Sequence, residues 1–412
     1  MGMNEMISLP WVPYLDSTIV FKPIANFLEA LKFDPMPKSL TLVLLLALLA
    51  CQPPVQYPDP LGVKVKGLIF TGPGRGPLTN DMFSSMAAVN ANFVAVVPEA
   101  SVYRQNLRVN YDFENQWFGE RKQATLDGIR LARANGLKVM LKPHLDIAWD
   151  MSGWERPELD LQDSLSRIQY SLSAREFIGQ QENRIDAEGH WRGGFMTKTE
   201  EDWNTFEKAY TDYILDYAQL ADSLNVELFC IGTEMKRTAL EKPDFWRRLI
   251  IRVKEVYSGP LTYAANWDSY DQITFWDDLD YIGVDAYFPL SEEKNPSLSQ
   301  LKTGWRPYVQ KLETLAKQYH KPVLLTEWGY ENEDYVGKEP WVMGRVQNNL
   351  SAPNDAAQVR AYESMFESLW TEPWMQGVFV WRWADYKGTP RGPNYSPRDR
   401  EAGEVLKREF GK

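Results

Sequence analysis

Two glutamates each follow a short apolar run, in positions where carboxyl groups could carry out acid–base chemistry. Glu234 comes after the run 226–231 in the sequence Ile-Gly-Thr-Glu, and Glu327 comes after the run 323–325 in the sequence Leu-Thr-Glu. Hydrolysis of a glycosidic bond needs two such groups, because one protonates the departing oxygen and the other attacks or stabilises the oxocarbenium-like centre. The pair indicates glycoside hydrolysis, with Glu234 as acid/base and Glu327 as nucleophile.

The surroundings expected for each glutamate would separate their tasks. Hydrogen bonds, with Tyr287 among the donors, would keep Glu327 ionised, whereas an apolar rim and the charge of Glu327 would raise the pKa of Glu234. Carboxyl groups about 5–5.5 Å apart would give retention of configuration through a glycosyl-enzyme intermediate. Taken singly, Glu234 also fits a helix N-terminus and Glu327 also fits a buried ion pair.

Aromatic and hydrogen-bonding residues accompany the two glutamates. The chain holds 16 Trp, 20 Tyr and 18 Phe, whose flat faces serve either as core filler or as platforms for sugars. We assign sugar platforms to Trp191, Trp267 and Trp381, and hydrogen bonds to sugar hydroxyls to His144, Arg192 and Asn266. Further candidates for the same rim are Trp149, Trp154 and Trp328. Residues expected to pack in helical segments are Trp203, Trp246 and Trp370.

The elements that must position these residues alternate between strands and helices. Eight apolar runs are expected to be strands of a buried parallel sheet: 65–70, 93–97, 138–141, 226–231, 261–265, 281–284, 323–325 and 378–380. Amphipathic segments expected to be helices are 121–134, 202–223, 245–257, 309–319 and 356–370. This alternation predicts an α/β fold, a single (β/α)8 TIM barrel, in which chemistry belongs at the C-terminal ends of the strands.

A doubly wound open sheet is the competing fold. Its phosphate-binding fingerprint would have to be Gly72-Pro-Gly-Arg-Gly-Pro, which lacks the GxGxxG spacing and whose prolines remove backbone donors, so a plain turn is the better interpretation. The longest connection follows the third strand, from His144 to about Thr199, and includes a polar helical stretch near 161–177. Loops of this length are usually functional, and we expect this one to form a wall of the binding site.

The first part of the chain resembles a secretion signal rather than a folded domain. Residues 40–50 are continuously apolar, too short for a membrane-spanning helix but suited to a signal peptide, and Leu-Leu-Ala-Cys51 resembles a bacterial lipobox. We therefore expect an upstream segment and signal peptide at 1–50, with Met36 as the true start, then lipidation of Cys51. A Pro-rich tether at 51–61 would precede one domain at 62–412. This predicts a lipid-anchored protein of the bacterial cell envelope; a buried helix with an incidental cysteine is the alternative.

Composition excludes several other functions. A net charge of −11 argues against binding of nucleic acid or of anionic membrane surfaces. No GxSxG motif supports an esterase, and the three histidines, His144, His190 and His320, lack the spacing of metal ligands. With Cys51 lipidated, Cys230 would be the other thiol, a packing residue in a strand. We expect no cofactor, no metal, a polysaccharide or oligosaccharide substrate, and a monomer.

Four strings together resemble glycoside hydrolase family 113. They are Val139-Met-Leu-Lys142-Pro-His144-Leu-Asp146, Trp191-Arg192-Gly193, Ile231-Gly-Thr-Glu234-Met and Leu325-Thr-Glu327-Trp-Gly, within a resemblance that covers nearly all of 63–385. The resemblance implies an endo-β-1,4-mannanase-like retaining glycosidase, with Glu234 as acid/base, Glu327 as nucleophile, and Lys142 and Asp146 among the substrate-binding residues.

Two features depart from the family pattern. In many members of the wider clan, the residue before the acid/base is an asparagine, and this asparagine bonds the sugar 2-hydroxyl. Here the residue at that position is Thr233. The segment 148–188 is an insertion that could lengthen, narrow or close the cleft. Two hypotheses therefore stand: a lipoprotein glycosidase that cuts a β-1,4-linked polysaccharide such as mannan or glucomannan, and a non-catalytic glycan-binding lipoprotein on the same scaffold.

Overall fold

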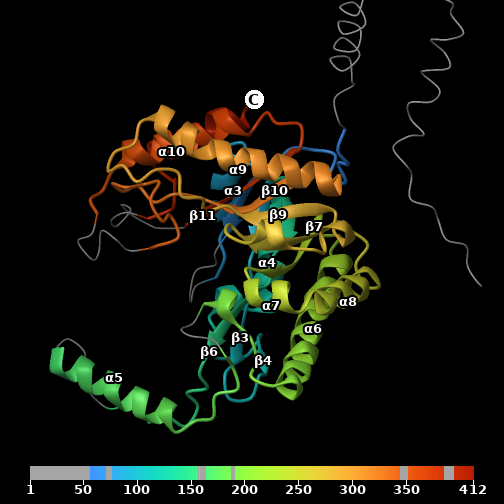
Figure 1. Ribbon diagram of the computed structural model, residues 1–412, viewed down its shortest axis with the longest axis vertical. Coiled ribbons are helices and arrows are strands. Elements are labelled where there is room, and N and C mark those ends of the chain that lie inside the picture. The colour runs from blue at the N-terminus through green and yellow to red at the C-terminus, as the bar shows by residue number, and fades with distance from the viewer. Residues whose placement is uncertain are drawn as a thin grey trace, which may run out of the picture. The chain divides into compact units, whose positions relative to one another are not determined.

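All eight apolar runs are strands, and in the computed structural model they close into one parallel barrel (Figure 1). In order around the barrel the strands are β1 (Val65–Phe70), β2 (Phe93–Val96), β5 (Lys138–Leu141), β7 (Leu228–Thr233), β8 (Leu261–Asn266), β9 (Tyr281–Asp285), β10 (Val323–Trp328) and β11 (Met375–Trp383). Pairing of β1 with both β2 and β11 closes the ring. The predicted (β/α)8 barrel is confirmed, and the open sheet is excluded.

The structure describes residues 56–70, 77–155, 157, 164–186, 191–343, 351–384 and 394–412. These all belong to one unit, Gln56–Lys412. The expected signal peptide, Met36, Cys51 and the glycine-rich string 72–76 lie outside the described residues. None of the described helices is long and apolar enough to cross a membrane.

Alternation along the strands divides the core into two layers. In β1, Val65 and Ile69 point into the barrel, where they join Met140, Cys230 and other strand residues in an inner cluster. Leu68 and Phe70 point outward, into the larger cluster between strands and helices. Because successive strand side chains face opposite sides, this register also decides which polar residues reach the interior at the strand ends.

Helices cover the outside of the barrel, and the five predicted segments are all helical. Their bounds are α4 (Lys122–Ala134), α6 (Glu200–Ser223), α8 (Pro243–Lys254), α9 (Leu298–Tyr319) and α10 (Asp355–Ser368). The other described α-helices are α3 (Asn80–Ala87), α5 (Ser164–Gly179), α7 (Lys236–Glu241) and α11 (Glu401–Phe410). Neighbouring α9 and α10 pack side by side (Figure 1). The prediction began α9 eleven residues late because Pro307 lies inside it, and proline normally ends a helix.

A small side sheet extends the barrel after its second and third strands, and the sequence did not predict it. It has the order β4 (Val109–Asn110), β3 (Glu99–Tyr103), β6 (His144–Ala148). The long insertion follows β6 and contains α5, close to the predicted stretch 161–177. Trp149 lies against Arg104, with 5.5 Å from the guanidinium to the indole centroid. Trp154 packs against Tyr170 of α5.

The segment before β1 contacts the N-terminal end of the barrel. Tyr57 stacks on His320, with ring centroids 5.7 Å apart. Asp59 accepts a hydrogen bond of 2.8 Å from Gln376, and the Leu61 amide donates one of 3.0 Å to Tyr281. The second half of the expected tether is therefore held against the barrel.

Candidate active site

A cavity of about 520 Å³ opens at the C-terminal ends of the strands, where chemistry was expected. It contains both glutamates. Its lining residues are His144, Trp191, Arg192, Glu234, Asn266, Trp267, Asp268, Tyr287, Glu327, Trp341, Met343, Trp381 and Tyr395. The cavity therefore brings together both expected catalytic residues and most of the expected sugar-binding residues.

Glu327 ends β10 and is held by three side chains from different strands. One oxygen, Oε1, accepts a short hydrogen bond from Lys142 Nζ and lies 3.4 Å from His144 Nε2. The other, Oε2, accepts a hydrogen bond of 2.8 Å from the Tyr287 hydroxyl. Between Leu325 and Glu327 the pairing of β10 with β9 shifts register, and such an irregularity re-aims the following side chain.

These contacts keep Glu327 ionised. Burial alone would raise its pKa, but the Lys142 ammonium and the contact with His144 outweigh burial and hold the pKa well below the usual range. Lys142 is itself fully buried, and contact with Asp285 and Glu327 keeps its pKa above the ordinary value in spite of that burial. The expected ionised state of Glu327, with Tyr287 as a donor, has this physical basis.

Glu234 follows β7 in a different environment. Its backbone is left-handed, with φ of 52°, and its amide donates to the Ala264 carbonyl at 2.8 Å. A non-glycine residue there is strained, which is typical of functional positions. Burial first, and then the charge of Glu327, raise its pKa, against the opposing effects of Arg192, Lys142 and the hydrogen bond from Trp191. The cavity therefore holds one carboxyl group whose pKa is raised and one whose pKa is lowered.

His144 is a neutral donor or acceptor at this site. Burial is the largest cause that lowers its pKa to about 3, and the positive charge of Arg192 adds to that effect. Its ring stacks over Trp381, with centroids 6.4 Å apart and planes at 16°. Its Nε2 is buried and faces Glu327 Oε1 at 3.4 Å, so the ring helps to hold that carboxylate.

Aromatic rings from distant loops form one wall of the cavity. Trp267, after β8, stacks on Trp341, in the loop after β10, with centroids 4.5 Å apart and planes at 18°. Beside them, Asn266 Nδ2 donates to Asp268 at 2.8 Å, and Asp268 also pairs with Lys236 at 2.7 Å. This chain of contacts fixes the orientation of the Asn266 amide.

Two of the expected substrate-binding residues do not line the cavity. The Lys142 side chain is 0% exposed, below the cavity floor, because its strand position points it into the barrel interior. Asp146 is on the outer part of β6 and pairs with Arg192 at 3.0 Å, so it positions Arg192. Both residues contact side chains that line the cavity and do not line it themselves. The expectation of direct substrate contact is therefore replaced by a supporting position, because Lys142 is buried and Asp146 faces Arg192.

Three further tryptophans that were expected at the rim of the cavity also lie elsewhere. Trp149 packs against Arg104 and Trp154 packs against Tyr170 of α5, and no described residue of 148–186 lines the cavity. Trp328 is fully buried against Tyr362. Thr233, in the position before the acid/base, is 3% exposed and also lies outside the lining, so it does not present its hydroxyl to a sugar.

Several residues of the site were not assigned from the sequence. Trp341, Met343 and Tyr395 come from long loops without strand or helix periodicity. Asp285 is buried beside Lys142, and the two-residue spacing from Tyr281 through Gly283 to Asp285 was the available signal, since alternate positions of a barrel strand face inward.

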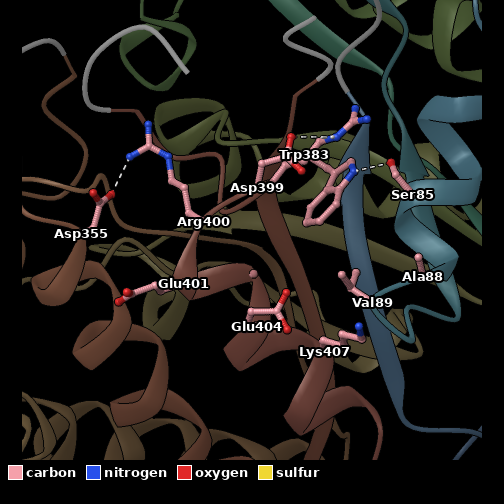
Figure 2. Close-up of a pocket in the computed structure, with 12 residues that line it drawn as sticks. Ser85, Ala88, Val89, Asp355, Trp383, Asp399, Arg400, Glu401, Glu404 and Lys407 are labelled. Carbon is pink, nitrogen blue, oxygen red and sulfur yellow. Dashed lines mark hydrogen bonds and ion pairs between the residues drawn. The ribbon is translucent and has the colours of Figure 1, made fainter. Parts of the chain in front are cut away.

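A second, larger cavity of about 720 Å³ lies between α3, α11 and the end of β11 (Figure 2). Its polar side chains contact one another: the Trp383 indole donates to Ser85 at 3.0 Å, and Arg400 pairs with Asp355 at 2.8 Å. It contains neither of the two glutamates. Within the described part of the chain no group of three His, Cys, Asp or Glu residues has the arrangement of a metal site.

The fold and the site together define the class of protein. An eight-stranded barrel with glutamates at the ends of its fourth and seventh strands, inside an aromatic-walled cavity, is that of a barrel glycoside hydrolase. The model of Glycoside Hydrolase Family 113 matches residues 185–392. The chain belongs to this family, and it is a glycosyl hydrolase.

Solved structures agree with this assignment at the level of the fold. The GH113 β-mannanase AaManA from Alicyclobacillus acidocaldarius, in complex with ManMIm, is 23% identical with a TM-score of 0.65, and the match covers 86% of this chain and 99% of that chain. A GH113 β-1,4-mannanase complex is 22% identical with a TM-score of 0.64, over 85% and 99% of the two chains. A Faecalibacterium prausnitzii β-glucuronidase has a TM-score of 0.51 at 15% identity, over 85% of this chain and 49% of that chain. Curated protein sequences show no significant match.

Proposed function

We propose that the protein hydrolyses β-1,4-linked mannan or glucomannan with retention of configuration, by double displacement. The observation that carries this proposal is that the pKa values of the two carboxyl groups of the cavity are shifted in opposite directions. Lys142 and Tyr287 bind Glu327 as a carboxylate, while burial and the charge of Glu327 favour a protonated Glu234. Two titratable groups whose pKa values are driven apart are typical of an acid and a nucleophile.

In the first step Glu327 attacks the anomeric carbon of the sugar. The bond from that carbon to the leaving oxygen breaks, and this oxygen takes the proton of Glu234. The charge of Glu327 disappears in the ester, which removes a cause of the raised pKa of Glu234. In the second step Glu234 is therefore a base: it takes a proton from water, the water oxygen attacks the anomeric carbon, and Glu327 is released.

The assignment of mannan as substrate rests on the family and on its solved β-1,4-mannanases. Mannose differs from glucose at the 2-hydroxyl, and Thr233 does not present a hydroxyl to the cavity. Among the polar residues of the lining, we assign this contact to His144, Arg192 and Asn266. Trp191, Trp267 and Trp381 supply flat faces for sugar C–H groups.

The test compares wild type with Glu327→Ala and Glu234→Ala on mannan, glucomannan, cellulose and xylan oligosaccharides. Wild type should release sugar from the mannans, and ¹H NMR should show the β anomer first. Glu327→Ala should be inactive while still binding oligosaccharide. Initial release of the α anomer would contradict retention. Activity confined to another glycan would overturn the substrate, and binding without hydrolysis of any glycan would favour the glycan-binding alternative.

We also propose that the chain is a lipoprotein of the bacterial cell envelope, anchored through Cys51. The support is the order of an apolar segment at 40–50, Cys51 and a Pro-rich stretch before the domain. In Cys51→Ala the protein should move from the membrane fraction to the soluble fraction of cells. Incorporation of labelled palmitate by wild type and not by the variant is the direct readout, and continued membrane retention of the variant would overturn the proposal.

A further inference from the structure

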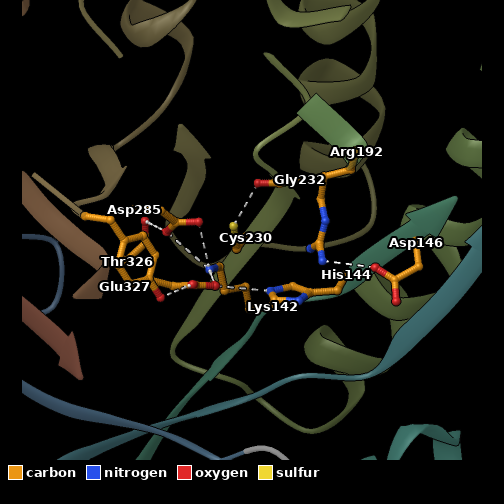
Figure 3. A network of polar contacts seen from close by, with 10 residues as sticks. Lys142, His144, Asp146, Arg192, Cys230, Gly232, Asp285, Thr326 and Glu327 are labelled. Atoms are coloured by element: carbon orange, nitrogen blue, oxygen red, sulfur yellow. Dashed lines mark hydrogen bonds and ion pairs between the residues drawn. The ribbon is translucent and has the colours of Figure 1, made fainter. Parts of the chain in front are cut away.

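Beneath the cavity, one ammonium group is shared by two carboxylates. Lys142 Nζ donates to Glu327 Oε1 and lies 3.3 Å from both oxygens of Asp285 (Figure 3). The side chains of Lys142 and Asp285 are 0% exposed, and that of Glu327 is 7% exposed. Solvent therefore cannot replace a partner that Lys142 loses.

The proposed reaction takes away one of these two partners. When Glu327 forms the ester with the anomeric carbon, its negative charge disappears, and a carboxylate appears on Glu234, which has given its proton to the leaving oxygen. A buried ammonium without an adjacent anion is strongly disfavoured. Lys142 then needs a second counter-ion at contact distance, and Asp285 lies at that distance.

We propose that Asp285 is a positioning residue that holds the charged Lys142 in place while Glu327 carries the sugar. The inference rests on the proposed double displacement. Asp285 does not line the cavity, so it acts through Lys142 and not on the substrate. Thr326 Oγ1 donates to Asp285 Oδ1 at 2.8 Å and orients the carboxyl group toward Lys142.

The charges around Asp285 link its pKa to the charge of Glu327. The ionisable groups that face the pair are Glu327, Glu234, Cys230 and His144. Burial first, and then the negative charge of Glu327, raise the pKa of Asp285. Esterification removes the charge of Glu327 and leaves the smaller effect of Glu234, so the pKa of Asp285 falls at the moment when Lys142 loses Glu327.

The experiment uses Asp285→Asn, which keeps the shape and removes the charge, in wild-type and Lys142→Met backgrounds. The matched control is Asp280→Asn, at the other end of β9, where the carboxylate accepts a hydrogen bond of 2.8 Å from the Leu261 amide. Stopped-flow release of the aryl group from 2,4-dinitrophenyl β-mannobioside measures formation of the glycosyl-enzyme. Calorimetry with mannotetraose measures binding.

Asp285→Asn should slow formation of the glycosyl-enzyme at least about tenfold and change mannotetraose affinity less than about twofold, because its effect depends on the charge of Glu327. In the Lys142→Met background the same substitution should have little further effect. Asp280→Asn should behave as wild type in both measurements.

Equal losses from Asp285→Asn in both backgrounds, or unchanged glycosyl-enzyme formation, would overturn the inference alone. Wild type without hydrolysis of any glycan would overturn the proposed function, and this inference with it.

Discussion

At the scale of single residues, the difference between the two glutamates depends on which carboxyl group contacts the Lys142 ammonium. Glu327 and Glu234 share one cavity, yet Lys142 contacts only Glu327 among the two. A fixed ammonium in a buried environment stabilises a carboxylate far more than it would in water, because little solvent screens the pair. The opposite pKa shifts of the two glutamates therefore depend on a residue that does not itself line the cavity.

Loss of the Lys142 charge should raise the pKa of Glu327. In Lys142→Met the acid limb of the kcat/KM profile should move at least about one pH unit upward, because Glu327 then takes a proton at higher pH. We expect kcat/KM to fall about 100-fold or more at neutral pH. Lys142→Arg keeps the charge and is the control, with an acid limb near that of wild type. A Lys142→Met profile that superimposes on wild type would contradict this electrostatic role.

Removal of the Glu234 carboxyl group should affect substrates according to their leaving groups. Glu234→Ala should lower kcat/KM for mannotetraose about 1,000-fold, but far less for a 2,4-dinitrophenyl mannoside, whose departing oxygen needs no proton. Azide should restore turnover and give a β-mannosyl azide, because it attacks the intermediate without a general base. Equal losses on both substrates, without azide rescue, would show that Glu234 is not the acid/base.

At the scale of elements, strand irregularities and loop contacts aim the side chains. β7 shifts register against β8 between Cys230 and Thr233, and β10 shifts against β9 just before Glu327. Both glutamates thus follow a break in regular pairing, as is common next to active sites. The side sheet similarly places His144 at the start of β6, beside Glu327.

The side sheet also carries an acidic group with a shifted pKa. Burial is the largest cause that raises the pKa of Glu99 on β3 to about 7 from 4.5, and Asp146 and Glu120 add to it. The folded state therefore binds this proton more tightly than the unfolded state, so the contribution of Glu99 to stability falls as the pH rises from about 4.5 through 7. Glu99→Gln should flatten this part of the pH dependence and be more stable than wild type at pH 8.

Urea unfolding at pH 5 and pH 8 checks this prediction, with the exposed Glu114→Gln as the control. The difference between wild type and Glu99→Gln should favour the variant more at pH 8 than at pH 5. A difference that is the same at both values would contradict the assigned pKa direction of Glu99.

The tryptophan stack should contribute to substrate binding more than to chemistry. In Trp341→Ala, the loss of the wall against Trp267 should raise KM for mannotetraose about fivefold to tenfold with a small change in kcat, since such ring contacts contribute about 0.5–1.5 kcal/mol. Trp117→Ala is the control, because Trp117 is 57% exposed and is not part of the cavity. An unchanged KM in Trp341→Ala would remove this wall from the binding site.

At the scale of the whole molecule, the strand pairing of the barrel does not depend on the insertion. The barrel closes through strand pairing, including that of β5 with β7 on either side of the insertion. Within the described part of the insertion, Trp154 contacts Tyr170 of α5, and Gln181 donates to the Asp150 carbonyl at 3.2 Å. Outside the insertion, Gln105 accepts a hydrogen bond of 3.1 Å from the Asp150 amide. The ends of the segment around α5 therefore lie close together.

Replacement of residues 156–180 with a short Gly-Ser linker should leave the barrel intact. We expect the melting temperature to change by less than about 3 °C, because no barrel strand loses a pairing partner. Activity on mannotetraose should stay within about twofold of wild type, because the cavity lining is unchanged. Calorimetry and reducing-sugar assays measure both quantities. A large loss of either would show that the insertion supports the barrel or the cavity.

Much of this protein can be predicted from its sequence, for a physical reason. Strands buried on both faces must be apolar, so carboxyl groups at the ends of such runs, as at Glu234 and Glu327, stand out against hydrophobic surroundings. The same logic predicts all eight barrel strands and places Tyr287, Asn266 and Trp267 at the cavity. Local pattern and the rule that parallel strand ends meet at one rim are sufficient for these residues.

Only the tertiary structure decides the contacts that depend on side chains meeting across the barrel. Lys142 was expected at the substrate and instead lies under Glu327 beside Asp285, because inward-facing positions of the third, sixth and seventh strands converge there. Trp341 meets Trp267 through the path of a long loop that has no periodic signal. The sequence by itself determines the barrel and its two glutamates; the environments that separate their pKa values arise from distances that no local pattern encodes.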